Sequence, residues 1–351
     1  MHPLLWRGQG KAEPTLIKNP MKAIVLEAAD KPLAWKEVPT PEAGPDEALV
    51  KIEAAALNRR DYWITVGKYA GLKYPTILGS DGAGVVTAVG NDADAHWVGK
   101  QVIINPGYGW GDHPEFQSDD FKILGLPDDG TFAQYVKVQV KQLFIKPDFL
   151  TFEQAAAIPL GGLTTYRALF TKAKIKPAET VLITGAGSGT GVFAVQLAVA
   201  HGCRVFVTSS SAEKIEAAKK LGAEDGVNYK DADWAEQLAK LAGGFDAIVD
   251  SALGDGFAKL PDVCKPGARI VFFGGTAGNI PAMNGRKIFW RQLQILGTTM
   301  GNEADFTAML NFVSEHSIVP IVGEVLPMAE GDRAIKMMEH SEHFGKIVLK
   351  A

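Results

Sequence analysis

The residues with the clearest chemical use in this chain form a glycine turn between two apolar stretches. Residues 181–191 run Val-Leu-Ile-Thr-Gly-Ala-Gly-Ser-Gly-Thr-Gly, and an apolar run at 192–199 follows at once. This pattern is typical of a buried strand, a tight turn and the start of a helix. The open N–H groups and the dipole at such a helix start favour a bound pyrophosphate. The turn therefore indicates a dinucleotide site and redox chemistry.

The wider sequence favours this interpretation over a turn that is only structural. A strict G-x-G-x-x-G is absent, but G-x-G-x-x-A occurs at Gly189, Gly191 and Ala194. A predicted strand at 204–208 and a helix-like stretch at 212–221 come next. Strand, turn, helix and strand within about thirty residues form one βαβ unit.

The end of the second strand indicates which dinucleotide binds. NAD-binding units carry Asp or Glu about twenty residues after the glycines, where the carboxylate bonds the ribose 2′-hydroxyl. Here residues 208–211 are Thr-Ser-Ser-Ser. Ser209 and Ser210 can donate hydrogen bonds to a 2′-phosphate, and Lys214 can neutralise its charge. We therefore predict NADPH, and Ser211 also suits the N-cap of the next helix.

The chain on the two sides of residue 150 has two different patterns of predicted secondary structure, and these elements must position the glycine turn. From 21 to about 144, short apolar runs separated by Gly, Pro and Asp predict strands at 47–54, 84–89, 101–105 and 132–138. From about 151, helix-like stretches alternate with strands at 181–184, 204–208, 247–249 and 269–273, and 293–298 is a candidate sixth strand. Alternation of this kind predicts an α/β fold with a doubly wound parallel sheet. In the tail, one helix-like segment at 306–314 and strand-like runs at 320–325 and 346–350 are expected to fold back onto the β-rich part.

Composition excludes several classes of protein. The chain has 351 residues, a net charge of −4 and two cysteines. Its length favours two domains, and its charge argues against nucleic-acid binding. Two cysteines cannot build a disulfide framework or a four-thiolate zinc site, and no apolar run reaches the roughly 18 residues of a membrane span. We predict a cytoplasmic protein without membrane or nucleic-acid partners. Residues 1–20 are interpreted as an N-terminal extension, with a transit peptide as the alternative.

Short segments in a fixed order resemble the medium-chain dehydrogenase/reductase superfamily, and specifically its zinc-free quinone oxidoreductase-like branch. The matching segments, besides the glycine turn, are 54–61, 79–85, 130–136, 162–166, 196–198, 218–223, 228–229, 273–275 and 345–349. The resemblance implies a β-rich GroES-like catalytic domain at 21–150, completed by 301–351. It also implies a Rossmann cofactor-binding domain at 151–300.

The chain departs from the zinc-dependent members of that superfamily. Asn58 stands where they carry a cysteine ligand, and Gly79-Ser80-Asp81 stands where they carry Gly-His-Glu. The segment 106–129, which holds four cysteines in those members, holds none here. Zinc prefers nitrogen and sulfur ligands. We therefore predict no metal.

The resemblance also implies roles for individual residues. Cofactor-binding residues would be Thr164, Gly187, Gly189, Thr190, Gly191, Ser209, Ser210, Lys214, Tyr229, Gly274, Gly275, Thr276 and Lys346. Two of these residues have an alternative without any role in cofactor binding, since Tyr229 could be an exposed loop residue and Lys346 a solvated charge.

Without zinc, the sequence offers no evident acid or base for simple alcohol oxidation. A quinone or an α,β-unsaturated carbonyl accepts hydride more readily, because its developing oxygen charge needs only hydrogen-bond donors. Candidate hydrogen-bond donors lie at 58–63 and at Tyr69. Asn58 and Tyr69 are the predicted catalytic residues, with aromatic core packing as the alternative for Tyr69.

We thus predict an NADPH-dependent oxidoreductase acting on a small carbonyl or quinone substrate. An alcohol or aldehyde dehydrogenase and a non-catalytic NADPH-binding protein are the alternatives. The resemblance implies a homodimer or homotetramer, for which the apolar strand at 293–298 is the expected contact. The segment 106–129 is predicted as a long surface loop whose aromatic side chains line the substrate cleft or, as we favour, pack on the body.

Overall fold

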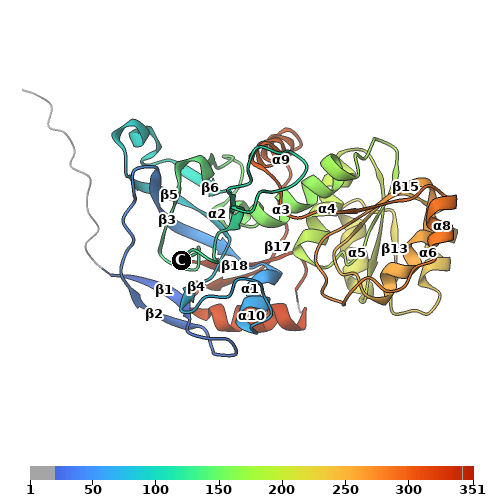
Figure 1. Ribbon diagram of the computed structural model, residues 1–351, viewed down its shortest axis with the longest axis horizontal. Helices are drawn as coiled ribbons and strands as arrows, with labels where there is room; N and C mark the ends of the chain where they lie inside the picture. Colours follow the sequence, from blue (N-terminus) through green and yellow to red (C-terminus); the bar gives the residue numbers. More distant parts are fainter. Residues whose placement is uncertain (1–19, 342) are drawn as a thin grey trace, which may run out of the picture.

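The computed structural model describes residues 20–341 and 343–351. Figure 1 shows two layered bodies side by side, with a β-rich body at one end and a parallel sheet with its helices at the other. The predicted N-terminal extension lies outside the described residues apart from Pro20. In the described part of the chain, no helix is long and apolar enough to cross a membrane.

The six-stranded sheet is entirely parallel and has the order β13-β12-β11-β14-β15-β16. Its strands are β11 (Thr180–Ile183), β12 (Arg204–Ser209), β13 (Asp225–Asn228), β14 (Phe245–Asp250), β15 (Cys264–Phe272) and β16 (Gln294–Gly297). This order is that of a Rossmann fold, so the predicted fold class is confirmed. Successive residues of β11 pack into different hydrophobic clusters, because helices cover both faces of the sheet.

One strand of this sheet, β13, was not predicted from the sequence. β13 has the sequence Asp-Gly-Val-Asn, in which only Val227 is buried. Asp, Gly and Asn are poor strand formers, so the segment lacks a strand pattern. The segment becomes a strand because it pairs with β12 in parallel register, with Asn228 opposite Ser209.

Helices connect these strands and cover the sheet. They are α4 (Gly189–Ala200), α5 (Ala212–Lys220), α6 (Trp234–Ala242), α7 (Leu260–Val263) and α8 (Gly285–Trp290), with the 3-10 turn η4 (Asp255–Lys259) before α7. Ser188 and Ser211 cap α4 and α5 by accepting backbone N–H groups, which satisfies donors that a helix start leaves open. The predicted N-cap role of Ser211 is therefore confirmed.

The β-rich body has a larger sheet of order β10-β6-β5-β3-β18-β17, on which β9 also pairs with β3, and a smaller sheet of order β2-β1-β4. The strands are β1 (Met21–Leu26), β2 (Ala34–Val38), β3 (Glu47–Ala56), β4 (Thr76–Ile77), β5 (Asp81–Val89), β6 (Gln101–Ile104), β9 (Tyr135–Gln139), β10 (Leu143–Ile145), β17 (Val322–Pro327) and β18 (Lys346–Lys350). Because β18 pairs antiparallel with β3, the tail returns to the β-rich part as predicted.

The tail holds two helices, where the sequence analysis expected one. α9 (Glu303–Glu315) matches the expected segment, and α10 (Gly331–His340) is additional. Residues Ala334, Ile335 and Met338 of α10 are buried against the β-rich core. The single-helix prediction was wrong because α10 is short and polar on average, and packing of this narrow apolar face stabilises it.

Segment 106–129 is not simply a surface loop. It forms a two-stranded ribbon from β7 (Gly107–Tyr108) and β8 (Lys122–Ile123), and Trp110 is only 8% exposed. The guanidinium of Arg167 lies 4.8 Å from the Trp110 ring and donates to the carbonyls of Pro114 and Glu115. The favoured packing of this segment on the body is confirmed for Trp110, whereas Phe116 is exposed.

Three short helices carry the chain from one body to the other. They are α2 (Phe152–Ala156), α3 (Pro159–Tyr166) and the π-helical turn η3 (Arg167–Lys172). At the other corner of the β-rich body, α1 (Arg59–Thr65) contacts α10. The N-terminal ends of α1, α3 and α4 and the start of β18 converge where the two bodies meet. Hydrogen bonds join α1, α3 and β18 through Asp81, and the start of α4 lies against Lys346 of β18.

Candidate active site

The glycine turn after β11 has no room for side chains. A Cβ on Gly191 would lie 2.5 Å from the carbonyl oxygen of Gly185, and a Cβ on Gly187 would clash with the Lys214 side chain. The Ser188 hydroxyl accepts from the Gly191 N–H at 3.0 Å and starts α4. The turn therefore presents bare backbone at a helix N-terminus, which is the arrangement that suits a pyrophosphate.

A cavity of about 780 Å³ opens beside this turn. Six of the predicted cofactor-binding residues line it, namely Gly187, Ser209, Ser210, Lys214, Tyr229 and Thr276. Arg59 and Trp63 of α1 line it from the β-rich body. The other predicted cofactor residues do not line this cavity; they are Thr164, Gly189, Thr190, Gly191, Gly274, Gly275 and Lys346.

A segment of the tail runs along the rim of the cavity and contacts Lys214. The Lys214 ammonium donates to the Ser341 carbonyl at 2.8 Å, and burial lowers the pKa of this lysine. His343 also lines the cavity. Burial, with Lys214 and Arg59 nearby, lowers the pKa of His343 to about 4, so this imidazole is neutral at pH 7. This end of the cavity therefore gathers several cationic or donor groups.

Lys346 joins the glycine turn to the β-rich body. Its stem covers Gly189, since a Cβ there would lie 2.6 Å from Lys346 Cδ. Its ammonium donates to Asn58 Oδ1 and to Asp81 Oδ2, each at 2.8 Å. Lys346 is 7% exposed and Asp81 is fully buried. The alternative of a solvated charge at Lys346 was wrong, because the tertiary fold places a buried carboxylate opposite it.

Asn58 and Asp61 form a reciprocal cap at the start of α1. The Asp61 Oδ2 accepts from the Asn58 N–H at 2.7 Å. The Asn58 Nδ2 and the Asp61 Oδ1 are both buried and have no hydrogen-bond partner among the described residues. Burial raises the pKa of Asp61 to about 6, and the opposing charge of Arg60 limits that rise. The cap therefore leaves one amide donor available for a ligand.

Arg60 lies in the candidate-donor segment 58–63 but is not among the predicted catalytic residues. Its guanidinium is 8% exposed and donates to Ser80 Oγ at 2.6 Å and to Tyr69 Oη at 3.3 Å. The same guanidinium lies 5.0 Å from the Tyr69 ring centroid. The Tyr69 ring also packs partly against the core of the β-rich body. The alternative of aromatic core packing therefore describes its ring, and the Tyr69 hydroxyl bonds Arg60.

Thr164 lies in α3 and is buried. Its hydroxyl donates to the Leu160 carbonyl at 2.8 Å and lies 3.9 Å from the Met300 sulfur. The Leu160 N–H in turn donates to Asp81 Oδ1 at 2.8 Å. Thr164 therefore belongs to the same corner as Asp81 and Lys346.

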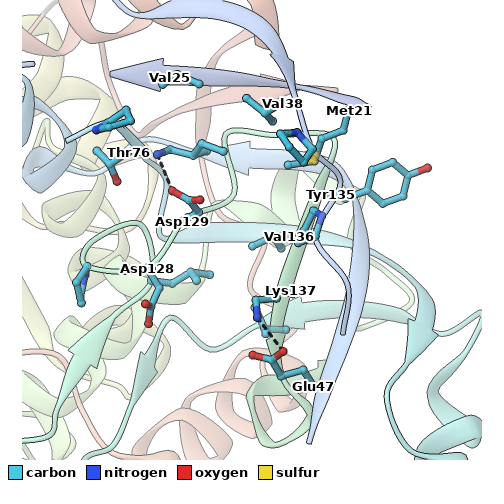
Figure 2. Close-up of a pocket in the computed structure, with 18 of the residues that line it drawn as sticks. Met21, Val25, Val38, Glu47, Thr76, Asp128, Asp129, Tyr135, Val136 and Lys137 are labelled. Atoms are coloured by element: carbon cyan, nitrogen blue, oxygen red, sulfur yellow. Dashed lines mark hydrogen bonds and ion pairs between the residues drawn. The ribbon is translucent and has the colours of Figure 1, made fainter. Parts of the chain in front are cut away.

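A second cavity, of about 650 Å³, lies within the β-rich body between β1, β4, β9 and the segment before β9. Figure 2 shows its mixed lining. Lys137 points toward Glu47, and the apolar part of the lining includes Met21, Val25 and Val38. No predicted site residue lines it. Leu124 lines this cavity, and its carbonyl accepts from Arg60.

Comparison with known proteins identifies the family. Residues 44–148 match the alcohol dehydrogenase GroES-like domain, and residues 189–315 match the zinc-binding dehydrogenase domain. A zinc-type alcohol dehydrogenase-like protein, YogA, of Leptosphaeria maculans is 35% identical, over 91% of this chain and 94% of that protein. The chain belongs to the medium-chain dehydrogenase/reductase superfamily.

Solved structures of this superfamily share the whole fold. The crystal structure of an NAD-dependent alcohol dehydrogenase has a TM-score of 0.87 and 36% identity, covering 94% of this chain and all of that one. A 2-octenoyl-CoA carboxylase reductase in complex with NADP and 2-octenoyl-CoA has a TM-score of 0.85 and 26% identity, covering 95% of this chain and 88% of that one.

The zinc ion that the family description implies does not fit the residues at this corner. The described residues contain no group of three or more His, Cys, Asp or Glu side chains that could hold a metal ion. Asn58 and Asp81 already bind the ammonium of Lys346. A divalent cation would have to displace that positive charge and would gain no thiolate or imidazole ligand.

The predicted site residues include Asn58, Tyr69 and Lys346 but not Asp81, Ser80 or Arg60. The structure brings these six residues to one corner, through bonds from Lys346 to Asn58 and Asp81 and from Arg60 to Ser80 and Tyr69. The only signal in the sequence was that Ser80 and Asp81 occupy the Gly-His-Glu position of zinc-dependent members.

The buried Asp61 predicts a specific pH dependence of stability. Its pKa is about 6 in the folded protein against 3.8 for the free side chain, so the folded state binds its proton more tightly. Stability therefore falls as the pH rises through this window, by about 2 to 3 kcal/mol in total. We expect Asp61→Asn to become more stable relative to the wild type by that amount between pH 4 and pH 8. Urea unfolding of both proteins across this range measures the difference, and a constant difference would contradict the assignment.

Proposed function

We propose that the protein is an NADPH-dependent reductase of quinones or α,β-unsaturated carbonyl compounds that works without a catalytic zinc. The observation that carries the proposal is the Lys346 ammonium between Asn58 and Asp81, with the Asn58 amide Nδ2 left without a partner. A corner that offers donors and fixed charges, and no metal ligands, suits an acceptor whose charge is already delocalised.

The nicotinamide cofactor would supply the hydride when bound, and the residues of this chain would position it and stabilise charge. The bare glycine turn would hold its pyrophosphate at the start of α4, and Lys346 would close over that turn. The buried Asn58 amide would donate to an oxygen of the cofactor or the acceptor. A buried donor without a partner carries a desolvation cost that a ligand oxygen would remove.

Tyr69 is the proposed proton donor. A guanidinium can only donate, so the Arg60–Tyr69 bond uses the phenol oxygen as acceptor. The Tyr69 O–H has no acceptor among the described residues and stays available for a substrate oxygen. Proton transfer would then leave a phenolate next to the Arg60 cation, which favours the transfer.

The choice of NADPH rests on Ser209, Ser210 and Lys214 at the cavity. One similar solved structure contains NADP, and another similar protein is named as NAD-dependent, so the residues of this chain must decide. We expect Lys214→Ala to weaken NADPH binding by about 10- to 100-fold, since a hydrogen bond to a charged group contributes about 1.5–3 kcal/mol. NADH binding should be nearly unchanged, because NADH lacks the 2′-phosphate. Fluorescence titration of both cofactors measures this, and equal losses for the two would contradict the assignment.

The reaction itself is tested by following NADPH absorbance with a panel of acceptors. The panel holds a 1,4-quinone, a 1,2-quinone, an enone, an enoyl thioester and an aldehyde. Turnover of conjugated acceptors alone supports the proposal. Aldehyde turnover would support the alternative of an alcohol or aldehyde dehydrogenase. The similarity to alcohol dehydrogenase-like proteins favours this alternative. Tight NADPH binding without any turnover would support a non-catalytic NADPH-binding protein. Stoichiometric zinc in elemental analysis would contradict the metal-free mechanism.

We also propose a homodimer or homotetramer in the cytoplasm. β16 is the edge strand of the parallel sheet, and the neighbouring α8 exposes Phe289 at 67% and Trp290 at 83%. An open strand edge beside exposed aromatic residues suits pairing with a second copy of the chain. Analytical ultracentrifugation tests this, and a monomer at micromolar concentration would overturn it.

A further inference from the structure

The starting observation is a buried cation whose hydrogen bonds include no charged partner. No carboxylate of the described residues lies within ion-pair distance of Arg60. Its hydrogen bonds all go to uncharged oxygens, those of Tyr69, Ser80, Leu124 and Leu126. The carboxylate of Asp61 opposes this charge but does not hydrogen-bond to the guanidinium. Because burial of a charge costs free energy, the guanidinium favours a further anionic partner that accepts its hydrogen bonds.

Two hydrogen-bond donors remain unused at this cation. A guanidinium has five N–H groups, and the four hydrogen bonds leave one N–H at Nη2. The Tyr69 O–H is the second, because the phenol oxygen serves as acceptor for Arg60 Nε. A positive charge with two unused donors is the chemistry that recognises an anionic oxygen.

The position of the cluster connects it to the cofactor site. Ser80, which binds Arg60, directly precedes Asp81, which binds Lys346. The stem of Lys346 lies on Gly189 of the glycine turn. Arg60 itself lies two residues after Asn58 at the start of α1. The cluster of Arg60, Tyr69 and Ser80 is therefore joined to the proposed cofactor site through Asp81 and Lys346, and none of its three residues lines the cavity beside the glycine turn.

We infer that this cluster is an anion site for the oxygen of the reduced acceptor, an enolate or a hydroquinone monoanion, and that Arg60 supplies its charge. The inference rests on the proposed function for its acceptor class. When hydride adds to the β-carbon of an enone, the C=C electrons move to the adjacent bond and the carbonyl electrons move to oxygen. Tyr69 then gives its proton to that oxygen, and Arg60 holds the resulting phenolate until solvent returns a proton. The enol converts to the saturated ketone after release.

A binding experiment tests the site without turnover. The probe is 4-nitrophenolate at pH 8.5 with saturating NADP⁺, followed by its absorbance change, and neutral 4-nitroanisole is the control of similar shape. We expect the wild type to prefer the phenolate by at least tenfold. Arg60→Gln should remove that preference and leave 4-nitroanisole binding unchanged, and Arg60→Lys should restore part of it. Arg204→Gln is the control variant, because it removes an exposed guanidinium that pairs with Glu224. It should change neither 4-nitrophenolate binding nor 4-nitroanisole binding.

The outcomes separate this inference from the proposed function. Equal binding of phenolate and anisole by the wild type, or a phenolate preference that survives in Arg60→Gln, would overturn the anion site. If Arg60→Gln does not fold, Arg60→Lys and Tyr69→Phe decide, since each should lower phenolate binding more than anisole binding. Phenolate binding that depends on Arg60, together with no NADPH oxidation in the acceptor panel, would overturn the proposed reductase activity and leave the anion site standing.

Discussion

Replacement of Lys346 by methionine is expected to destabilise the folded protein by about 3–5 kcal/mol, because it leaves a buried carboxylate without its cation. Asp81 is fully buried, and its Oδ2 accepts from the Lys346 ammonium at 2.8 Å. The other oxygen of Asp81 accepts from the Leu160 N–H, which cannot replace the lost charge. Because methionine fills a similar volume over Gly189, the loss reports charge more than packing.

The partner substitution makes this prediction specific. Asp81→Asn in the Lys346→Met background should recover most of the lost free energy of unfolding, since removing both charges removes the uncompensated one. The pair of exposed Lys350 and half-buried Glu153 is the control, and Lys350→Met should cause no clear change. Urea unfolding of the wild type, Lys346→Met, Asp81→Asn and the double variant measures the coupling, and Lys350→Met is unfolded beside them. Additive effects of the two buried substitutions would show that Lys346 and Asp81 do not act as a pair.

Replacement of Gly191 by alanine is expected to weaken NADPH binding by at least about 100-fold, which corresponds to about 2.7 kcal/mol. The new Cβ would lie 2.5 Å from the Gly185 carbonyl oxygen and 3.0 Å from Ala186 Cα, and both are backbone atoms. Backbone cannot move aside as a flexible side chain can, so the turn must open and the N–H groups lose their alignment.

Two other glycines calibrate this effect. A Cβ on Gly187 would meet the flexible Lys214 side chain, so Gly187→Ala should reduce the preference for NADPH over NADH more than overall nucleotide affinity. A Cβ on Gly285 would meet nothing within 4 Å, so Gly285→Ala should leave the cofactor preference and the nucleotide affinity unchanged. Fluorescence titration with each cofactor ranks the three variants. NADPH affinity of Gly191→Ala within threefold of the wild type would contradict a pyrophosphate site at this turn.

Local pattern predicted most of the cofactor-binding sheet. β11, β12, β14 and β15 overlap the predicted strands, because central strands of a parallel sheet are apolar on both faces. β16 lies at the edge of the sheet and also overlaps its predicted strand. β13 and α10 were missed for a common reason. Each has few apolar residues, and each is stabilised by pairing or packing with an element distant in the sequence.

The sequence by itself determined the family, the glycine turn and the serine-rich end of β12, because these depend on residue types at short spacing. The corner formed by Asn58, Arg60, Tyr69, Ser80, Asp81 and Lys346 was decided only by the tertiary structure. Lys346 and Asp81 are 265 positions apart, and β18 must pair with β3 before the ammonium can reach the carboxylate. Whether a lysine is a solvated charge or a buried ion depends on what the fold places opposite it, and that information is not local to any segment of the chain.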